Sequence, residues 1–267
     1  MIELQIETIS TCSARCTFCV YPGLDRAGHT MPMSLFQKIV DEAVTIPSIE
    51  RFVLHGLGEP TLDKILEERM RYVRERSSVP IEIYTHGAHL LPSRFDSLKD
   101  AGMSSLVFSL NAVRQDQHEA IMGLKGKFDI VCRNIDYAIA NRGSMWIEVH
   151  AVVNGDSFTI GDAVEFDARW KGFSKVVREN NWAGENRTLH AIDGNACCGR
   201  ALGQIYVLYD GRVSMCCYDP TGKTIFGDLR TQTIREVYNS EYYSMFRGMH
   251  SADKAAVFKQ CRNCTRT

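Results

Sequence analysis

Residues 10–23 read STCSARCTFCVYPG, so that Cys12, Cys16 and Cys19 lie at positions i, i+4 and i+7 of one short segment. The alternating residues 2–8 before it predict a β-strand, and we therefore expect the cysteines on the loop that leaves the first strand. Three thiolates at this spacing can hold three corners of a cubane iron–sulfur cluster and leave the fourth iron without a protein ligand. The alternative is a zinc site that takes its fourth ligand from a distant cysteine or histidine.

The composition excludes several classes of function. The chain has 267 residues and a formal net charge of -1, from 31 Lys and Arg against 32 Asp and Glu, so no global field favours nucleic acid. No apolar run approaches the roughly 20 residues of a membrane helix, and the first residues lack a secretion signal. We expect a cytoplasmic protein without a membrane span. Because thiols stay reduced there, its ten cysteines indicate metal ligands rather than disulfides.

Strand and helix patterns alternate about six times before residue 185. The later strands are predicted within RFVLHG (51–56), IEIYTHG (81–87), SSLVFSLNA (104–112), MWIEVHAVV (145–153) and FSKVV (173–177). A single helix, through Phe128 and Ala138, is expected between the fourth and fifth strands. This alternation predicts a parallel sheet with right-handed crossovers, and polar residues follow the strands where such folds place active sites.

The C-x3-C-x2-C spacing, with Phe18 before the last cysteine and a strand in front, resembles the signature of the radical S-adenosylmethionine (SAM) superfamily. The resemblance implies that the open iron binds the amino and carboxylate groups of SAM. It also implies that SAM is cleaved to a 5'-deoxyadenosyl radical, which abstracts a hydrogen atom from the substrate. An external electron donor such as flavodoxin or ferredoxin is implied as a partner.

The same resemblance implies a glycine-rich turn after the second strand and polar residues after the third and fourth strands. GLGEP (56–60) supplies the turn, with Glu59 as the charge partner of the ammonium group of SAM. The cofactor-binding residues implied in this way are Gly56, Gly58, Glu59, Pro60, Thr85, His86, Ser109 and Asn111.

A second set of cysteines lies near the C-terminus. Cys198 and Cys216 flank a hairpin predicted around Asp210-Gly211, and Cys261 and Cys264 form a C-x2-C pair. Four thiolates so placed could close around a second cluster or a zinc ion. The layout resembles the twitch or shortened SPASM extension of radical enzymes, which implies that these four cysteines fully ligate one auxiliary [4Fe-4S] cluster.

Two further cysteines adjoin this set. Cys197 could exchange roles with Cys198 as the ligand. Cys217 is expected on the opposite side of its strand from Cys216, where it is either a buried apolar thiol or a hydrogen-atom donor. The second role is the one implied by a resemblance to radical epimerases.

The segment RENNWAG (178–184) follows the sixth predicted strand. Arg178, Glu179 and Asn181 could bind hydroxyl or amino groups and form a substrate wall. A solvated loop is the alternative.

The sequence therefore predicts an α/β fold, a partial (β/α)6 TIM-type barrel in residues 1–184 followed by a small α+β auxiliary-cluster domain in residues 185–267. The expected reaction is hydrogen-atom abstraction from a C–H bond of a small polar substrate, giving dehydrogenation, as in the aminocyclitol dehydrogenases that the chain resembles. An amino sugar, aminocyclitol or nucleoside derivative is expected rather than a peptide, because no extra leader-binding domain is evident.

Several alternatives stay open at this point. Cys217 could support epimerisation or isomerisation, and a peptide could be the substrate. Outside enzymes, the cysteines could belong to an iron–sulfur electron carrier or a zinc-binding module.

Overall fold

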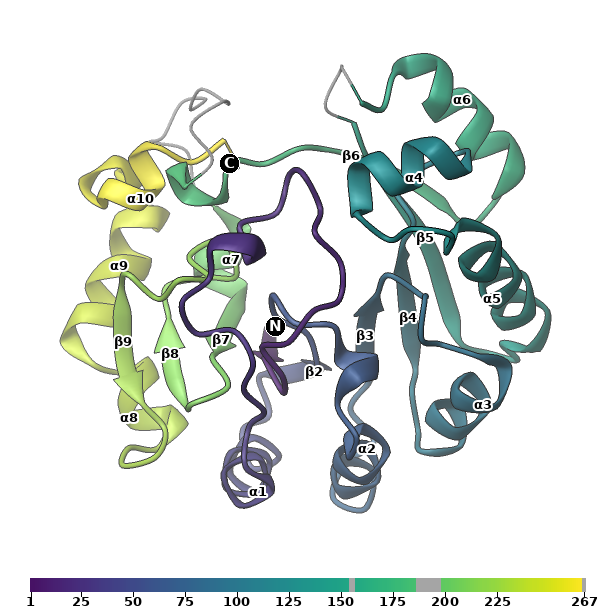
Figure 1. The fold of residues 1–267 in the computed structure, drawn as a ribbon. Coiled ribbons are helices and arrows are strands. Elements are labelled where there is room, and N and C mark those ends of the chain that lie inside the picture. The colour runs from purple at the N-terminus through teal and green to yellow at the C-terminus, as the bar shows by residue number, and fades with distance from the viewer. Residues whose placement is uncertain (154–156, 186–197, 266–267) are drawn as a thin grey trace.

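The structure is a computed structural model that describes residues 1–153, 157–185 and 198–265. Within these residues one sheet has the order β6-β5-β4-β3-β2-β1-β7-β8-β9 (Figure 1). The strands are β1 (Ile2–Ile6), β2 (Ile49–Val53), β3 (Ile81–Thr85), β4 (Ser105–Ser109), β5 (Trp146–Val153), β6 (Ser174–Arg178), β7 (Gln204–Val207), β8 (Arg212–Ser214) and β9 (Ile225–Asp228). Strands β1 to β6 are parallel to their neighbours, which confirms the predicted partial barrel.

Helices connect the strands and lie along the outer side of the curved sheet (Figure 1). Those of the barrel are α1 (Met33–Ala43), α2 (Leu66–Arg74), α3 (Pro92–Asp100), α4 (Gln115–Met122), α5 (Phe128–Asn141) and α6 (Ile160–Arg169). Between β4 and β5 the sequence predicted one helix, and the structure has two. Gly123 ends α4 with a left-handed φ of 67°, which glycine adopts without steric cost.

Alternation along β1 separates the hydrophobic core from the inside of the barrel. Leu4 and Ile6 have no exposed surface and join the apolar cluster between helices and sheet. Successive side chains of a strand point to opposite faces, so Glu3 and Gln5 face the other way, where both line a cavity. The polar residues Glu3 and Gln5 of β1 thus line the interior of the barrel.

The sheet continues beyond residue 185, because β7 pairs in parallel with β1. Strands β7 and β8 form the expected antiparallel hairpin, and Gly211 in its turn has a φ of 91°. The helices after this hairpin are α8 (Ile234–Tyr238), α9 (Glu241–Ser251) and α10 (Lys259–Arg262), while α7 (Gly199–Gly203) precedes it. The division into domains at residue 185 stays a prediction.

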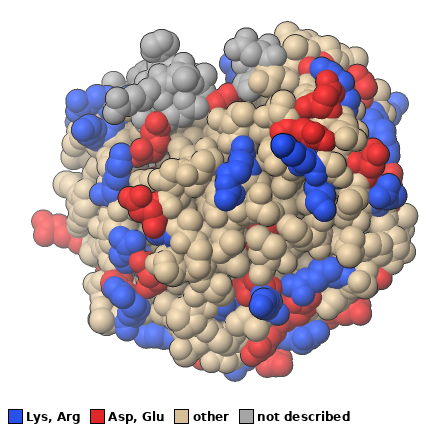
Figure 2. All heavy atoms as spheres, viewed as in Figure 1, with Lys and Arg blue, Asp and Glu red and all other residues tan. Residues whose placement is uncertain are grey.

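The surface carries charges of both signs. On the face in Figure 2, Lys and Arg alternate with Asp and Glu over the described residues and form no broad basic patch. None of the described helices combines the length and the apolar character needed to cross a bilayer.

Candidate active site

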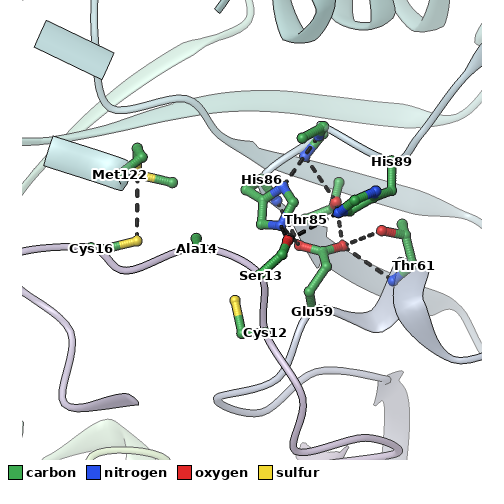
Figure 3. A network of polar contacts seen from close by, with 12 residues as sticks. Cys12, Ser13, Ala14, Cys16, Glu59, Thr61, Thr85, His86, His89 and Met122 are labelled. Carbon is green, nitrogen blue, oxygen red and sulfur yellow. Dashed lines mark hydrogen bonds and ion pairs between the residues drawn. The ribbon is translucent and has the colours of Figure 1, made fainter. Parts of the chain in front are cut away.

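Cys12, Cys16 and Cys19 all line one cavity of about 190 Å³, which we call the first cavity. Met122 of α4 reaches the same place, with 3.5 Å between its sulfur and Cys16 Sγ (Figure 3). Burial raises the pKa of Cys12 to about 12 and also raises the pKa of Cys16 and Cys19. Thiolates in such surroundings need a cationic partner, and an iron cluster provides one, so the donor set fits a cluster.

The three thiols line a cavity and do not converge on one position that could hold a single metal ion. No three His, Cys, Asp or Glu side chains of the described part of the chain lie close enough to hold a single metal ion. Even so, all three cysteines line the same cavity, and burial together with the ionised forms of Cys19 and Cys12 raises the pKa of Cys16.

The glycine-rich turn after β2 packs against the loop that leaves β1. A Cβ on Gly58 would lie 2.0 Å from the carbonyl oxygen of Ile9, and a Cβ on Gly56 would lie 2.4 Å from Cγ of Glu7. Glu7 is completely buried, pairs with Arg26 and accepts a 3.1 Å hydrogen bond from the backbone N–H of Leu57. The turn therefore needs glycine for close approach, and its bare backbone lines the first cavity.

Glu59 joins the turn to the end of β3 (Figure 3). Its carboxylate accepts hydrogen bonds from Thr61 N (3.1 Å) and Oγ1 (2.5 Å), from Thr85 Oγ1 (2.6 Å) and from His86 N (2.9 Å). Burial alone would raise the pKa of Glu59, but His86 and the hydrogen-bond donors lower it overall. An ionised carboxylate in the wall of the first cavity suits a cationic group of a ligand.

The expected residues after β3 and β4 lie in the same wall: Thr85, His86, Ser109 and Asn111 line the first cavity. Asn111 has a left-handed φ of 57°, and its side chain accepts from Val152 N at 3.0 Å and donates toward Met122 Sδ at 3.1 Å. Pro60 instead begins the short helix η2 (Pro60–Leu62) and does not line this cavity. The cofactor roles of these residues stay predictions.

A second cavity of about 280 Å³ adjoins the first. The two share seven lining residues, which are Phe18, His55, Gly56, Leu57, Tyr84, Val152 and Trp182. The second cavity alone is lined by Glu3, Gln5, Val53, Glu179, Asn180, Arg200, Tyr206, Cys217 and Tyr218. His55, Tyr84, Trp182 and Arg200 were not predicted from the sequence, because no spacing marks residues that meet only through the curvature of the sheet.

Cys217 lies in the wall of the second cavity. Its sulfur accepts a 3.2 Å hydrogen bond from Arg200 Nη1, and its backbone N–H donates to Gln204 Oε1 at 3.1 Å. This thiol is therefore placed beside a binding space rather than inside the apolar core. Its role as a hydrogen-atom donor stays a prediction.

The predicted ligands of the auxiliary cluster, Cys198, Cys216, Cys261 and Cys264, influence one another electrostatically. Burial raises the pKa of Cys216, and Cys261 and Cys198 contribute to that rise. Burial raises the pKa of Cys261 to about 12, and Cys264 and Cys198 contribute to that rise. His250 of α9 lies among them, since Nδ1 accepts from Cys198 N at 3.4 Å and Nε2 lies 3.5 Å from Cys261 Sγ. Cys197, the alternative ligand, lies outside the described residues.

The three residues expected at a substrate wall separate in the structure. Glu179 lines the second cavity, whereas Arg178 is exposed at the end of β6 and lines neither cavity. Asn181 is 2% exposed and binds the backbone of Asn263 and Thr265 near the C-terminus. The roles of these three residues in binding a substrate stay predictions.

Family models identify the class of protein. The model of the radical SAM superfamily matches residues 6–155, which is more than half of the chain, and the SPASM model, an iron–sulfur cluster-binding domain, matches residues 197–265. The chain belongs to the radical SAM superfamily. It is a radical SAM enzyme whose cofactors are S-adenosylmethionine and [4Fe-4S] clusters. That membership sets aside the electron carrier and the zinc-binding module.

The chain is also similar to individual proteins. GTP 3',8-cyclase of Desulforamulus reducens is 30% identical over 153 residues, which are 56% of this chain and 44% of the cyclase. The matches to the first curated relatives cover 34 to 46% of the relatives' own length.

Two solved structures share the fold over nearly the whole chain. BtrN in complex with AdoMet and 2-DOIA has a TM-score of 0.72 at 19% identity, covering 100% of this chain and 94% of BtrN. Streptococcus suis SuiB bound to precursor peptide SuiA has a TM-score of 0.74 at 14% identity, covering 99% and 69%. At these identities the likeness extends to the fold alone.

Proposed function

We propose that this enzyme removes a hydrogen atom from a C–H bond of a small polar substrate and yields the dehydrogenated product. The substrate class is an amino sugar, an aminocyclitol or a nucleoside derivative. The second cavity supports the proposal, because it shares seven lining residues with the first cavity, so a molecule bound there would lie beside a cofactor held in the first cavity. The bound cofactor supplies hydrogen-atom abstraction, while the residues below hold and orient the substrate.

The lining of the second cavity suits a small polyhydroxylated or amino-substituted ring. Its volume, about 280 Å³, is near the lower end of small-molecule pockets, which hold roughly 300 to 1,000 Å³. Tyr84, Trp182 and Tyr218 offer aromatic faces to the C–H side of a ring, and Glu179 and Arg200 offer charges to amino and hydroxyl groups. The 2-DOIA ligand of BtrN supports a small substrate in this fold.

His55 supports dehydrogenation in particular. Its ring stacks on Tyr84 with 4.9 Å between centroids, and its Nδ1 is buried without a hydrogen-bond partner in the described residues. Burial lowers the pKa of His55 to about 4, so the imidazole is neutral at pH 7 and keeps a lone pair. After one hydrogen atom has been abstracted, oxidation of an alcohol carbon still releases the hydroxyl proton and one electron. The proton could be accepted by this nitrogen. The electron would be accepted by the auxiliary cluster held by the C-terminal cysteines.

Replacing His55 with phenylalanine is expected to lower kcat for dehydrogenation about 100-fold, at the low end of the roughly 100- to 10,000-fold contribution of a positioned base. His55→Gln, which keeps an acceptor, is expected to lose less. The measurements are the rate of formation of the dehydrogenated product and the amount of that product per 5'-deoxyadenosine, with a panel of amino sugars, aminocyclitols and nucleosides. His29→Phe is the matched control, because His29 lines neither cavity and phenylalanine keeps its stacking on Tyr209. If His55→Phe kept the wild-type kcat and the wild-type yield of product per 5'-deoxyadenosine, His55 would not be the base.

Epimerisation is the second candidate, and the position of Cys217 favours it. A thiol in the wall of the second cavity could return a hydrogen atom to a substrate radical. In that reaction the C–H bond is re-formed, the sulfur is left as a thiyl radical, and an external thiol or electron donor must restore it.

Turnover in deuterated water separates the two candidates. Under our proposal the product lacks two hydrogens and carries no deuterium, and Cys217→Ala keeps at least half of the wild-type rate. Cys132→Ala is the control, since Cys132 lies in α5 outside both cavities. One deuterium at a single carbon without net mass loss, abolished in Cys217→Ala, would establish epimerisation instead.

Modification of a peptide is the remaining alternative, supported by the fold shared with SuiB. The volume of the second cavity, about 280 Å³, favours a small molecule over an extended chain. A flavodoxin or ferredoxin as electron donor also belongs to this proposal.

A further inference from the structure

Two consecutive residues, Asn181 and Trp182, contact three segments that carry predicted cluster ligands, which are the loop of Cys12 to Cys19, the segment that follows Cys216, and the loop of Cys261 and Cys264. The indole Nε1–H of Trp182 donates a 2.6 Å hydrogen bond to the carbonyl of Phe18. Phe18 lies between Cys16 and Cys19 in the loop of the first cavity. The first contact therefore fixes the backbone of the N-terminal cysteine loop.

The ring of Trp182 makes the second contact. It packs edge-on against Tyr218, with 5.7 Å between centroids and an interplanar angle of 82°. Tyr218 directly follows Cys216 and Cys217. The side chain of Trp182 thus contacts both the N-terminal cysteine loop and the segment that follows Cys216 and Cys217.

Asn181 makes the third contact, with the terminal cysteine pair. Its Nδ2 donates to the carbonyl of Asn263, its Oδ1 accepts from Thr265 N at 3.0 Å, and its own N–H donates to Thr265 Oγ1 at 3.0 Å. Asn263 lies between Cys261 and Cys264. An amide that is 2% exposed and bonded in both directions holds this loop in one orientation.

The backbone at this point is strained. Trp182 and Ala183 have φ of 50° and 52°, a left-handed conformation that costs free energy in residues other than glycine. The Oδ1 of Asn180 accepts from Trp182 N at 2.9 Å and helps to hold the turn. Such a conformation persists only where surrounding contacts fix it, so displacing the terminal loop would shift Trp182.

Trp182 also lines both cavities, and a shift of its ring changes the wall of the first cavity. We propose that Asn181 and Trp182 are positioning residues that couple the auxiliary cluster site to SAM binding, so that an occupied auxiliary site raises the affinity for SAM. The proposal rests on the cysteines as cluster ligands, and it is independent of whether the substrate is oxidised or epimerised.

The test compares SAM affinities without substrate and without turnover. Reconstituted protein with both clusters is compared with a Cys261→Ala/Cys264→Ala protein, in anaerobic equilibrium dialysis with oxidised clusters. The Kd ratio is the Kd for SAM of the Cys261→Ala/Cys264→Ala protein divided by that of the protein with both clusters. With Asn181 and Trp182 unchanged, this ratio is expected to be about five or more, within the usual range of coupling between sites. Coupling of binding free energies is reciprocal, so at equilibrium with a competing chelator SAM should also raise the fraction of iron that the auxiliary site retains.

Asn181→Ala is expected to reduce this ratio to about one, although Asn181 does not line the first cavity. Trp182→Phe, which keeps an aromatic ring but loses the indole N–H, is expected to give an intermediate ratio. Asn263→Ala is the matched control, because Asn181 binds the backbone carbonyl of Asn263 and that group stays. A wild-type ratio of one, or an unchanged ratio in both Asn181→Ala and Trp182→Phe, would overturn the coupling.

These outcomes are separate from those of the proposed function. Dehydrogenation could fail for every substrate while the Kd ratio holds. Equally, the ratio could be one in an enzyme that oxidises its substrate.

Discussion

Replacing Gly58 with alanine is expected to abolish detectable SAM binding and to lower the free energy of unfolding by about 3 kcal/mol or more, at the upper end of overpacking effects. The new Cβ would lie 2.0 Å from the carbonyl oxygen of Ile9 and 2.7 Å from its carbon. These are backbone atoms at the start of the cysteine loop, so no side-chain rotation relieves the overlap. The turn and the loop must separate, and both line the first cavity or lead into it.

Urea unfolding of the cluster-free protein and equilibrium dialysis with SAM after reconstitution measure the two effects. Gly248→Ala is the matched control, because Gly248 lies inside α9 and a Cβ there would meet no atom within 4 Å beyond the backbone of its own helix. That variant should be stabilised by about 0.5 to 1 kcal/mol, since alanine is the better helix former. SAM affinity within twofold of wild type in Gly58→Ala would mean that the turn does not shape the cofactor wall.

Replacing Glu59 with glutamine is expected to cost about 3 kcal/mol of stability, within the range for breaking a buried charged network. Each of the groups of Thr61, Thr85 and His86 that contact the carboxylate donates a hydrogen bond to it. A glutamine NH₂ would face some of these donors and leave them unpaired. The ends of β2 and β3 would separate, and the affinity for SAM should fall at least 10-fold.

The pH dependence of stability tests the same network. The folded pKa of Glu59 lies below its ordinary value, so its contribution is present above pH 4.5 and is lost as pH falls through the folded pKa. Below pH 4.5 the stabilities of wild type and Glu59→Gln should therefore converge.

Glu67→Gln is the control for Glu59, because Glu67 is 8% exposed, pairs with Arg94 at 2.8 Å and lines neither cavity. It should lose stability without losing affinity for SAM. Equal loss of affinity in both variants would contradict a specific role for Glu59.

Local sequence patterns were sufficient for the barrel and for the positions of its polar loops. Each parallel strand ends at the same edge of the sheet, so residues that follow separate strands, such as Glu59, Thr85 and Asn111, were expected together and line one cavity. The hairpin at Gly211 was predictable because an Asp-Gly pair favours its turn.

Other features depend on packing that leaves no local pattern. Helix α4 is short and ends at Gly123, so its pattern merged with that of α5, and the contact between Met122 and Cys16 was missed with it. His55 follows the apolar end of β2 and becomes notable only because it lines both cavities. Trp182 owes its contacts to a left-handed backbone that tryptophan rarely adopts.

The pairing of β1 with both β2 and β7 also bears on synthesis at the ribosome. One edge of β1 can be covered as soon as β2 emerges, but the other waits for residues 204–207, after most of the chain has been made. Until then the nascent chain exposes an unpaired strand edge next to three free cysteines, a combination open to misassembly and oxidation. Expression conditions that slow aggregation and supply iron early should therefore improve the yield of intact enzyme more than those that only raise the rate of synthesis.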